Sequence, residues 1–322
     1  MSLTEQEVRH FNEEGYLVKP GIYSQEDMQP LKEAINGIVD SKSRQLKEEG
    51  VIDEIYEGEG FETRLACIYR DSSKAGRAIC HAVMGKGGGG FSGPEIFEMI
   101  RHPGLVSCIS SLVGPDVVGS SVYRIRTKMP HYDHGEVPWH QDSGYFLAHC
   151  DQYMVVTCWV PLVDTTIENG CLYVLPSTHK NGILRHYTGG HAGFLEIPDE
   201  DLPVKDPAPI EMEAGGVLLL TNLTPHASYT NSSNVVRWSI DLRYQGTEAP
   251  NNVDEPPETY TPERDAVTMA CYPPEADFVI KDTAHPENQV NSADEFHELR
   301  ERYEKARPFS PGRGWTSMRE KK

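Results

Sequence analysis

The sequence lacks the features that mark membrane-spanning, secreted and thiolate-metal proteins. No window of the 322 residues reaches the roughly 18 uninterrupted apolar residues of a transmembrane helix. The opening residues, MSLTEQEVRHFNEEGY, have neither the basic region nor the apolar core of a signal peptide. The seven cysteines are scattered without a CxxC pair, which is typical of reduced thiols and argues against a thiolate metal site. We therefore expect a cytoplasmic protein with no membrane partner.

Positive charge is also scarce. Lys and Arg number 30 against 49 Asp and Glu, and the formal net charge is -19. Such a chain repels nucleic acid and anionic lipid, so we expect neither as a partner. Hydrophobic residues make up 38% and charged residues 25%, the balance of a folded globular protein rather than a disordered one. The composition implies no particular oligomeric state.

The residue pattern divides the chain into three parts of one predicted domain, residues 1–322. Residues 1–115 are predicted to be mainly helical. Residues 116–245 carry short β-rich segments separated by turns, which is the spacing of an antiparallel sandwich or barrel. Residues 246–322 form a Pro-rich, acidic C-terminal extension, for which we predict a role as a lid or an interface.

Helix signals are clearest at the two ends of the chain. Thr4 and Glu7 form a capping box that begins a helix, and Gly15 ends that helix before the short apolar strand YLVKPG. A second helix is predicted over about 24–39, and a C-terminal one over about 293–305.

The pattern between these signals is weaker. Residues 42–94 show little periodicity, and the run GKGGGGFSGP at 85–94 lacks the Gly-Lys-Ser/Thr ending of a phosphate-binding loop. We predict a flexible loop there. The segment from 94 to 114 predicts one or two short helices.

The stretch EVPWHQDSGYF contains a candidate metal site. In an extended segment His140 and Asp142 project to the same face, close enough to share one cation. Because a surface turn can also contain this pair, a third ligand is needed, and His226 is the best candidate. Two imidazoles and one carboxylate form the facial triad that suits non-haem Fe(II) and leaves positions open for substrate and oxygen.

A hairpin prediction connects this triad to a carboxylate-binding arginine. If residues 231–234 form a four-residue loop, His226 pairs with Ser239 and Ser228 pairs with Arg237, so all four side chains share one face. An arginine with a hydroxyl beside it, near a metal, can grip a carboxylate. A dicarboxylic acid that chelates the metal at its other end has the shape of 2-oxoglutarate.

These motifs resemble the phytanoyl-CoA dioxygenase family of Fe(II)- and 2-oxoglutarate-dependent oxygenases. The N-terminal stretch FNEEGYLVKPGIYSQEDMQPLKEAI is similar to that family's first helix, strand and helix. The family's later motifs follow in order as TKMP, VPWHQDSGYF, WVPLVDTTIENGCLYVLPSTHKNG and TPHASYTNSSNVVRWSIDLRY. The resemblance covers most of residues 8–245, whereas residues 43–100 and 246–322 match poorly and are expected to shape the substrate pocket.

The resemblance implies a fold and a set of site residues. The fold is a mainly β, double-stranded β-helix (jelly roll) with flanking N-terminal and C-terminal helices. The iron ligands are His140, Asp142 and His226. Arg237 anchors the distal carboxylate of 2-oxoglutarate with the help of Ser228, and Lys128 lines the cosubstrate or substrate cavity.

The resemblance also implies an activity. With Fe(II), 2-oxoglutarate and O2, such an enzyme oxidises an unactivated C–H bond of a small molecule and releases succinate and CO2. The presence of Asp142 favours hydroxylation, or another oxidation such as desaturation or ring closure, over halogenation. We expect a small metabolite or a natural-product intermediate as substrate, because the acidic chain offers no large basic patch for a polyanion such as coenzyme A.

Several further residues are candidates for the substrate pocket, although each also has a structural interpretation. Aromatic residues beside a strand are commonly core, histidines in a loop are commonly solvent-exposed, and basic residues on a strand commonly form ion pairs. The candidates are Arg124, Arg126, His131, His134, Trp139, Gln141 and Tyr145.

Three other residues are assigned structural roles. Arg243 shares the side-chain parity of Arg237 and needs a partner, for which Asp241 is the candidate. His179 belongs to a turn of the family and Glu168 to a tight bend, so neither is expected to act in catalysis.

Two other functions remain open from the residues alone. A jelly-roll hydrolase or isomerase can use the same triad with Zn2+ or Mn2+, but gives the carboxylate-binding arginine no purpose. A non-catalytic binding protein on the same fold would not be expected to keep a complete triad. Stoichiometric formation of succinate from 2-oxoglutarate would distinguish the oxygenase from both.

Overall fold

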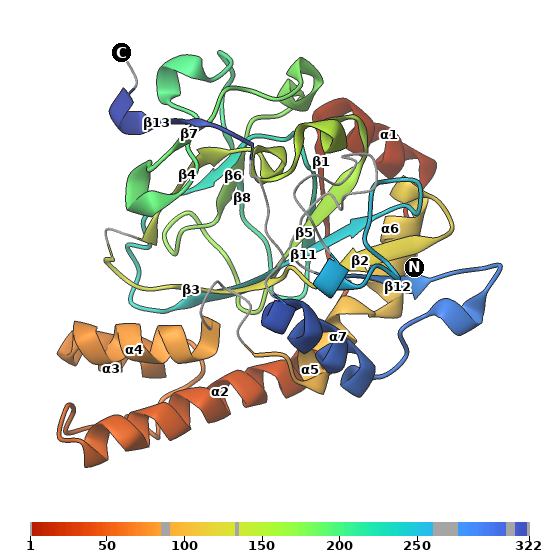
Figure 1. Ribbon diagram of the computed structural model, residues 1–322. Helices are drawn as coiled ribbons and strands as arrows, with labels where there is room; N and C mark the ends of the chain where they lie inside the picture. Colours follow the sequence, from red (N-terminus) through yellow and green to blue (C-terminus); the bar gives the residue numbers. More distant parts are fainter. Residues whose placement is uncertain (1, 85–90, 133–134, 260–275, 307–312, 321–322) are drawn as a thin grey trace.

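The structure, a computed structural model, describes residues 2–84, 91–132, 135–259, 276–306 and 313–320 (Figure 1). In this part of the chain 40% of residues are helical and 21% lie in strands. The prediction of a mainly β chain is therefore not supported, because the helices flanking the sheets hold more residues than the sheets themselves. Most of the predicted glycine-rich loop lies outside the described residues.

Six of the seven α-helices formed by the described residues lie before Gly114. They are α1 (Glu5–Glu14), α2 (Gln25–Glu48), α3 (Arg64–Asp71), α4 (Ser73–Met84), α5 (Pro94–Ile100), α6 (Pro103–Val113) and α7 (Ala293–Ala306). The predicted first, second and C-terminal helices and the two short ones after residue 94 are thus confirmed. Their starts follow local chemistry: Thr4 and Glu7 make the predicted capping box, and Ser24 makes a second one with Asp27.

Two helices, α3 and α4, lie where the sequence showed little periodicity. The N-cap of α3 makes no side-chain hydrogen bond, so its start carries no sequence signal. Both helices bury an apolar face, with Leu65 and Ile68 on α3 and Ile79 and Val83 on α4. Tertiary packing, rather than capping, therefore stabilises this pair.

The strands form two antiparallel sheets and one short parallel pair. They are β1 (Tyr16–Lys19), β2 (Val117–Ser120), β3 (Arg124–Lys128), β4 (Val137–His140), β5 (Val155–Pro161), β6 (Leu172–Val174), β7 (Tyr187–Thr188), β8 (Ala208–Ile210), β9 (Val217–Thr221), β10 (His226–Ser228), β11 (Arg237–Gln245), β12 (Asp277–Lys281) and β13 (Thr316–Ser317). The larger sheet has the order β1-β9-β5-β11-β2-β12 with β3 also paired to β11, and the smaller has the order β4-β10-β6-β8. Because β1 and β12 lie outside residues 116–245, the sheet core extends beyond its predicted limits.

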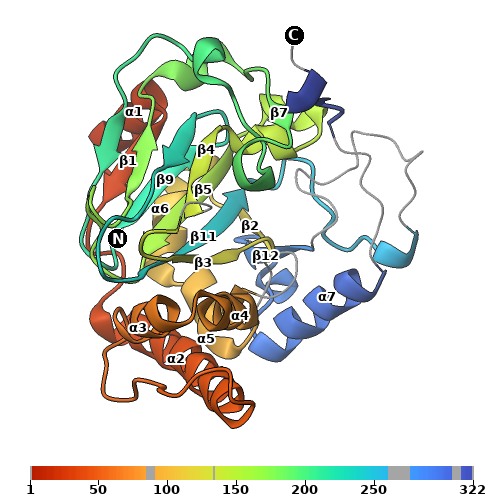
Figure 2. The same cartoon turned by 90° about the vertical axis from the view of Figure 1, so that its left-hand side faces the viewer.

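The central strand β11 separates the main apolar core from the interior between the sheets. Trp238, Ile240 and Leu242 belong to an apolar cluster shared with helices α2 to α6. Figures 1 and 2 show α2, α3 and α4 gathered on this side of the larger sheet. The alternate residues of β11, beginning with Arg237, face the other way, as the two-residue period of a strand requires.

The predicted hairpin between residues 226 and 239 is wrong. Strand β10 pairs with β4 and β6 in the smaller sheet, whereas β11 pairs with β3 and β5 in the larger one. The connecting segment crosses from one sheet to the other, and the Asn231 side chain holds it by donating to the carbonyl oxygens of Lys128 and Val235 at 2.9 and 2.7 Å. Strands β10 and β11 therefore face each other instead of lying side by side.

The sequence analysis expected no membrane-spanning helix and reduced cysteines. Of the helices formed by the described residues, none has the length and apolar run needed to cross a bilayer. The six cysteines in the described part of the chain are free, and five of them are buried.

Candidate metal centre

A cavity of about 270 Å³ lies between the inner faces of the two sheets. Its walls come from β3, β5, β9 and β11 on one side, from β4, β6 and β10 on the other, and from the segment that carries Gly193 and Phe194. The described residues that line it include His140, Asp142, His226, Ser228 and Arg237. The hairpin prediction was wrong, but His226, Ser228 and Arg237 still line one cavity, because β10 and β11 face each other across it.

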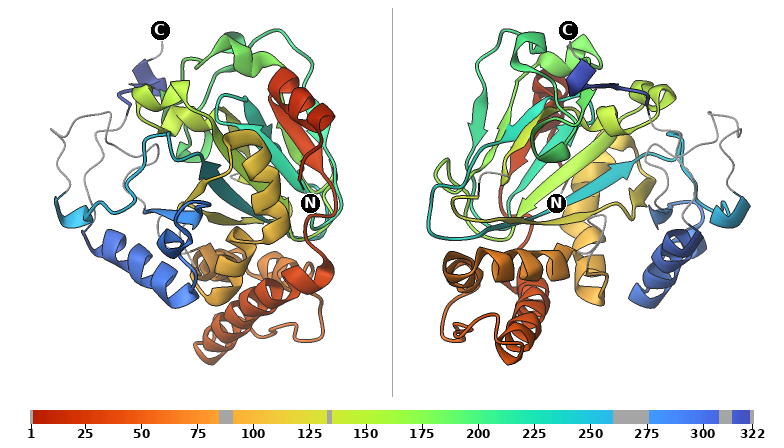
Figure 3. Two further views of the ribbon diagram at one scale, coloured as in Figure 1. Left: turned by 90° about the vertical axis from the view of Figure 1, so that its right-hand side faces the viewer. Right: turned by 60° about the vertical axis from the view of Figure 1, so that its left-hand side comes forward.

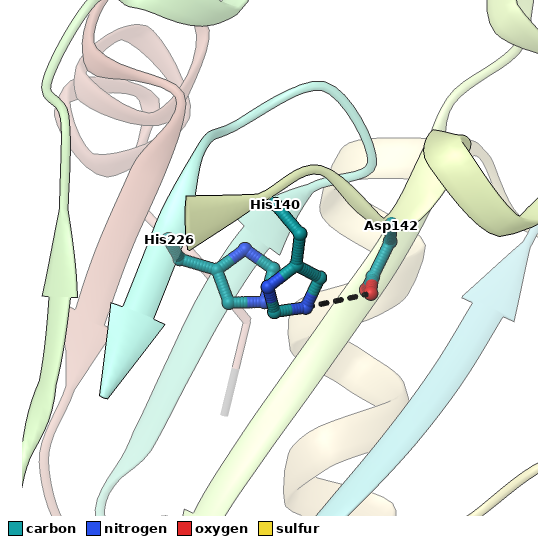
Figure 4. Close-up of side chains that lie close together, drawn as sticks. All are labelled: His140, Asp142 and His226. Carbon is teal, nitrogen blue, oxygen red and sulfur yellow. Dashed lines mark ion pairs between the residues drawn. The ribbon is translucent and has the colours of Figure 1, made fainter. Parts of the chain in front are cut away.

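The three predicted ligands meet in this cavity (Figure 4). His140 ends β4 and His226 begins β10, and the two residues pair directly across the smaller sheet. Asp142 follows two residues after His140, in the 3-10 helix Asp142–Tyr145. One potential ligand atom from each residue lies within 4.8 Å of the others, and all three residues are buried. The group could therefore hold a metal ion.

Hydrogen bonds fix which imidazole nitrogens face the centre. The carbonyl oxygen of Pro138 lies 2.9 Å from Nδ1 of His140, and that of Thr224 lies 3.0 Å from Nδ1 of His226. A carbonyl can only accept, so each Nδ1 carries the proton and each Nε2 presents a lone pair. Burial, and then the neighbouring His226, lowers the pKa of His140 to about 3, which keeps this imidazole neutral.

Asp142 is held in its ionised form. Burial on its own raises the pKa of this carboxyl, but Arg243 and the two histidines outweigh burial and hold the pKa well below its usual range. Nη2 of Arg243 lies 3.1 Å from Oδ1, and the Thr157 hydroxyl donates to Oδ2. The prediction that Arg243 pairs with Asp241 is therefore wrong, because the fold brings Arg243 to the candidate ligand instead.

Arg237 is arranged as an anion site. It is only 3% exposed, its Nη1 donates to the Ser239 hydroxyl at 3.4 Å, and its Nε has no partner in the structure. Its guanidinium lies over the ring of Trp159 at 5.1 Å. Burial lowers the pKa of Arg237 to about 10, so it remains a cation at neutral pH. Ser228 also lines the cavity and donates to the carbonyl oxygen of Gly170 at 3.3 Å.

Lys128 makes contacts with backbone carbonyl groups beside the cavity. It is absent from the described residues that line the cavity. Its ammonium donates to the carbonyl oxygens of Gly135, Ser228 and Tyr229 at 2.9, 3.1 and 2.5 Å. Burial, and then Arg237, lowers the pKa of Lys128 to about 6, although three carbonyl acceptors favour the charged ammonium. Lys128 thus connects β3 to the end of β10.

Three of the predicted substrate-pocket residues line the cavity. Arg124 and Arg126 point into it from β3, and Nε of Arg126 donates to Asp241 at 2.8 Å. Tyr145, 38% exposed, stands edge-on to His140 with ring centroids 6.0 Å apart.

The remaining candidates lie elsewhere. Trp139 packs in a separate apolar cluster, and His131 is exposed at a left-handed turn with φ 52°. The Gln141 side chain is fully buried and saturated by backbone partners, donating to the carbonyl oxygens of Gly182 and Leu223 and accepting from the Leu184 N–H. Trp139, His131 and Gln141 are therefore not among the described residues that line the cavity. His134 lies outside the described residues.

His179 and Glu168 also lie away from the cavity. Nε2 of His179 is 3.2 Å from the carbonyl oxygen of Asn12, and Glu168 is exposed on a turn. Neither is among the described lining residues.

Sequence reasoning missed several lining residues. Thr157 and Trp159 come from β5, whose seven residues are all buried, so no alternation marked the inward face. Phe194 comes from an irregular segment with no sequence signal. The two-residue period of a strand shows that Thr157 and Trp159 share a face, but the sequence does not show that this face is the one toward the cavity.

The C-terminal segment packs against the turn that carries Asp142. Trp315 donates from Nε1 to the Gly144 carbonyl oxygen at 2.7 Å, and its ring contacts that of His186 at a tilt of 38°, with centroids 5.2 Å apart. Arg313 donates to the Ser143 carbonyl oxygen and forms an ion pair with Asp151. In Figure 3 the C-terminal strand β13, in dark blue, lies beside green segments of the chain, in agreement with its pairing to β7.

Three comparisons place the chain among known proteins. The sequence profile of the family "Phytanoyl-CoA dioxygenase (PhyH)" matches residues 11–239. A phytanoyl-CoA dioxygenase of Arabidopsis thaliana is 34% identical over 109 residues, which is 34% of this chain and 38% of that protein's length. The phytanoyl-CoA dioxygenase domain-containing protein 1 of Danio rerio is 28% identical over 270 residues, 73% of this chain and 87% of that protein.

Solved structures show the same fold. The non-heme monooxygenase ThoJ matches with a TM-score of 0.53 at 19% identity over 93% of this chain and 96% of that chain. The non-heme, alpha-ketoglutarate-dependent carbocyclase SnoK matches with a TM-score of 0.50 at 20% identity over 76% of this chain and 84% of that chain. Since the family profile spans well over half of the sequence, the chain belongs to the phytanoyl-CoA dioxygenase family.

Proposed function

We propose that this protein is an Fe(II)- and 2-oxoglutarate-dependent oxygenase in which His140, Asp142 and His226 bind the iron. One observation carries the proposal: the three ligand atoms share a cavity with Arg237, a buried guanidinium with an unpartnered Nε. Family membership supports the same cofactor and cosubstrate. We further propose that the two facing sheets are the halves of a double-stranded β-helix.

The donor set fits Fe(II). Two neutral imidazoles and one carboxylate are the ligands of non-haem iron oxygenases, and three protein ligands leave the remaining positions for cosubstrate and oxygen. The Pro138 and Thr224 carbonyls orient the imidazoles, and Arg243 with Thr157 keeps the carboxylate ionised.

Arg237 and Ser228 are proposed to bind the distal carboxylate of 2-oxoglutarate. Ser228 lies two residues after His226 on β10, so it is about 7 Å from that ligand along the same face. Arg237 faces it from β11 and is held flat by Trp159. The dicarboxylate would span this distance, with its keto acid end at the metal and its other end at the guanidinium.

The other residues of the cavity orient the substrate and exclude water. Val137, Leu172 and Leu220 supply apolar walls around the triad. When bound, the iron and 2-oxoglutarate would activate O2 for oxidation of a C–H bond, with one oxygen atom entering succinate and CO2 released. We propose hydroxylation of a small metabolite or natural-product intermediate as the reaction. The fold alone does not choose it, since ThoJ is a monooxygenase and SnoK a carbocyclase.

An anaerobic titration of the Fe(II)-loaded protein with 2-oxoglutarate tests this proposal. We expect the weak visible charge-transfer band of the chelate to appear and saturate. In His226→Ala both iron binding and the band should be lost, whereas His81→Ala, at an exposed position of α4, should behave as the parent protein. Iron bound without the band would contradict the oxygenase and favour a hydrolase or isomerase with the same triad.

A further inference from the structure

The cavity carries an excess of positive side chains, although the whole chain has a formal net charge of -19. Its lining has two carboxylates among the described residues, Asp142 and Asp241. It also has four guanidinium groups, from Arg124, Arg126, Arg237 and Arg243. In an acidic protein such a local reversal of charge indicates an anionic occupant.

Two of the four arginines are neutralised within the protein. Arg243 binds Asp142 at 3.1 Å, and Arg126 binds Asp241 at 2.8 Å. The described residues offer no carboxylate in an ion pair with Arg124 or Arg237.

The proposed cofactors account for only one of these two remaining cations. One carboxylate of 2-oxoglutarate would face Fe(II), and the other, distal carboxylate would occupy Arg237. Arg124 is then left over. This half-buried guanidinium donates from Nη1 to the carbonyl oxygen of Tyr123 at 2.9 Å and lines the cavity.

Strand register places Arg124 within a small molecule's length of the triad. Arg124 lies directly opposite Asp241 on β11, about 5 Å away between Cα atoms. Arg243, which binds Asp142, is two residues further along β11, about 7 Å. An anion at Arg124 therefore belongs to the molecule that is oxidised and not to a distant carrier group.

We propose that the primary substrate carries an acid group, a carboxylate or a phosphate ester, and that Arg124 binds this group while the carbon to be oxidised faces the triad. The rest of the substrate is apolar, because Val137, Leu172 and Leu220 line the same space. The proposal rests on the proposed function, since it assumes that 2-oxoglutarate occupies Arg237. Arg124 is thus a specificity-determining residue.

The test compares matched acids and amides on the anaerobic Fe(II) and 2-oxoglutarate complex. The probes are straight-chain carboxylates of three to eight carbons, their primary amides, and alkyl phosphates of the same lengths, at constant ionic strength. Perturbation of the charge-transfer band gives a Kd for each probe. We expect one acid series to bind at least about 10-fold more tightly than the amides, and the carboxylate and phosphate arms to tell which acid is preferred.

Three variants assign the acid preference to Arg124. Arg124→Gln should weaken binding of the preferred acid by about 10- to 100-fold, the effect of losing a charge-assisted hydrogen bond. Its affinity for 2-oxoglutarate and for the amides should stay unchanged. Arg124→Lys should keep much of the preference for acids over amides. Arg9→Gln, at an exposed position of α1, should match the parent protein.

The possible results separate this inference from the proposed function. Without the band in the iron-loaded parent protein, the proposed function fails and this inference fails with it. A normal band with equal or no binding of acids and amides overturns the acid-group proposal alone. The acid-group proposal is also overturned if the acid preference survives in Arg124→Gln, because Arg124 would then not bind the acid. It is overturned as well if this variant loses affinity for 2-oxoglutarate, because Arg124 would then bind the cosubstrate.

Discussion

Arg237 illustrates how a single side chain can be prepared for a ligand. Burying its guanidinium to 3% exposure removes the free energy of hydration of the cation, and no carboxylate among the described residues forms an ion pair that would compensate. Trp159 and Ser239 compensate for part of this loss and restrict the side chain to one orientation. A carboxylate that enters the cavity thus meets a cation that is already desolvated and oriented, which strengthens the bond.

At the residue scale we predict that Arg237→Gln raises the Kd for 2-oxoglutarate by about 10- to 100-fold. Iron binding should be unaffected, because Arg237 contacts none of the three proposed ligands directly. The charge-transfer band gives the Kd, and metal analysis gives the iron content. Arg70→Gln, at an exposed position of α3, is the matched control. Unchanged affinity in Arg237→Gln would remove this residue from the cosubstrate site.

At the scale of elements, helix α1 is connected to the metal centre through Gly15. This residue ends α1 with φ 81° and begins the turn into β1. The Thr224 hydroxyl donates to the Gly15 carbonyl oxygen at 2.6 Å, and the Thr224 carbonyl accepts from His226. One threonine therefore joins the helix end to a candidate ligand.

We predict that Gly15→Ala lowers the free energy of unfolding by about 3 kcal/mol, from the left-handed conformation and from overlap with neighbouring atoms. A Cβ at Gly15 would lie 2.4 Å from Nδ1 of His179 and 2.7 Å from Oγ1 of Thr224. Gly21→Ala is the control, because Gly21 has φ 66° but open space around it. Urea unfolding measures both, and equal losses would show that the close contacts cost little.

The N-terminal cap of α1 gives a pH-dependent prediction. The pKa of Glu7 falls to about 2 from 4.5, chiefly because Lys19 donates to its carboxylate and then because the Thr4 N–H does. A lowered pKa in the folded state means that folding favours the ionised form. This contribution is fully present above about pH 4.5 and is lost as the pH falls toward about 2.

Glu7→Ala should therefore lower the free energy of unfolding by about 1 kcal/mol at pH 7. The difference from the parent protein should shrink as the pH falls below about 4.5. Urea unfolding at pH 7 and pH 3.5 checks both statements. Glu5→Ala is the control, since the Glu5 side chain is 93% exposed. A difference that grows in acid would contradict the assigned sign.

At the scale of the whole molecule, helix α1 and the C-terminal segment both contact residues beside the candidate site. Helix α1 reaches His226 through Thr224, and the C-terminal segment reaches the Asp142 turn through Trp315. His186, under Trp315, accepts from the Gln141 N–H at 2.9 Å. Burial lowers the pKa of His186 to about 4, so its Nε2 stays an acceptor.

We predict that Trp315→Ala weakens Fe(II) binding by about 10-fold, because Trp315 holds Gly144 in the 3-10 helix that begins with Asp142, and groups that position a metal ligand have effects of this size. The C-terminal segment should also become more sensitive to limited proteolysis. Arg319→Gln, exposed in the same segment, should change neither result. Faster proteolysis with unchanged metal affinity would show that the segment covers the site without positioning Asp142.

The sequence by itself determined the candidate ligands and most of the regular elements. His140 and Asp142 are two residues apart, so their relation to one cation is local and survives any tertiary arrangement. The caps of α1 and α2 and the β-rich segments before Gln245 are equally local signals, and the structure contains these elements. His226 and Arg237 lie far along the chain from this pair: a hairpin prediction that the structure contradicts connected them, and the family resemblance implied both residues separately.

Only the tertiary structure decided which strands pair and which charges meet. The connection after β10 is short enough for a hairpin, yet β10 lies between β4 and β6, because backbone groups pair with whichever neighbour the whole sheet provides. Arg243 binds Asp142 and not Asp241 for the same reason: the two are 101 residues apart, and their contact exists only once the sheets face each other. Long-range contacts of this kind leave no period in the sequence, so the excess positive charge of the cavity could be counted only in the folded molecule.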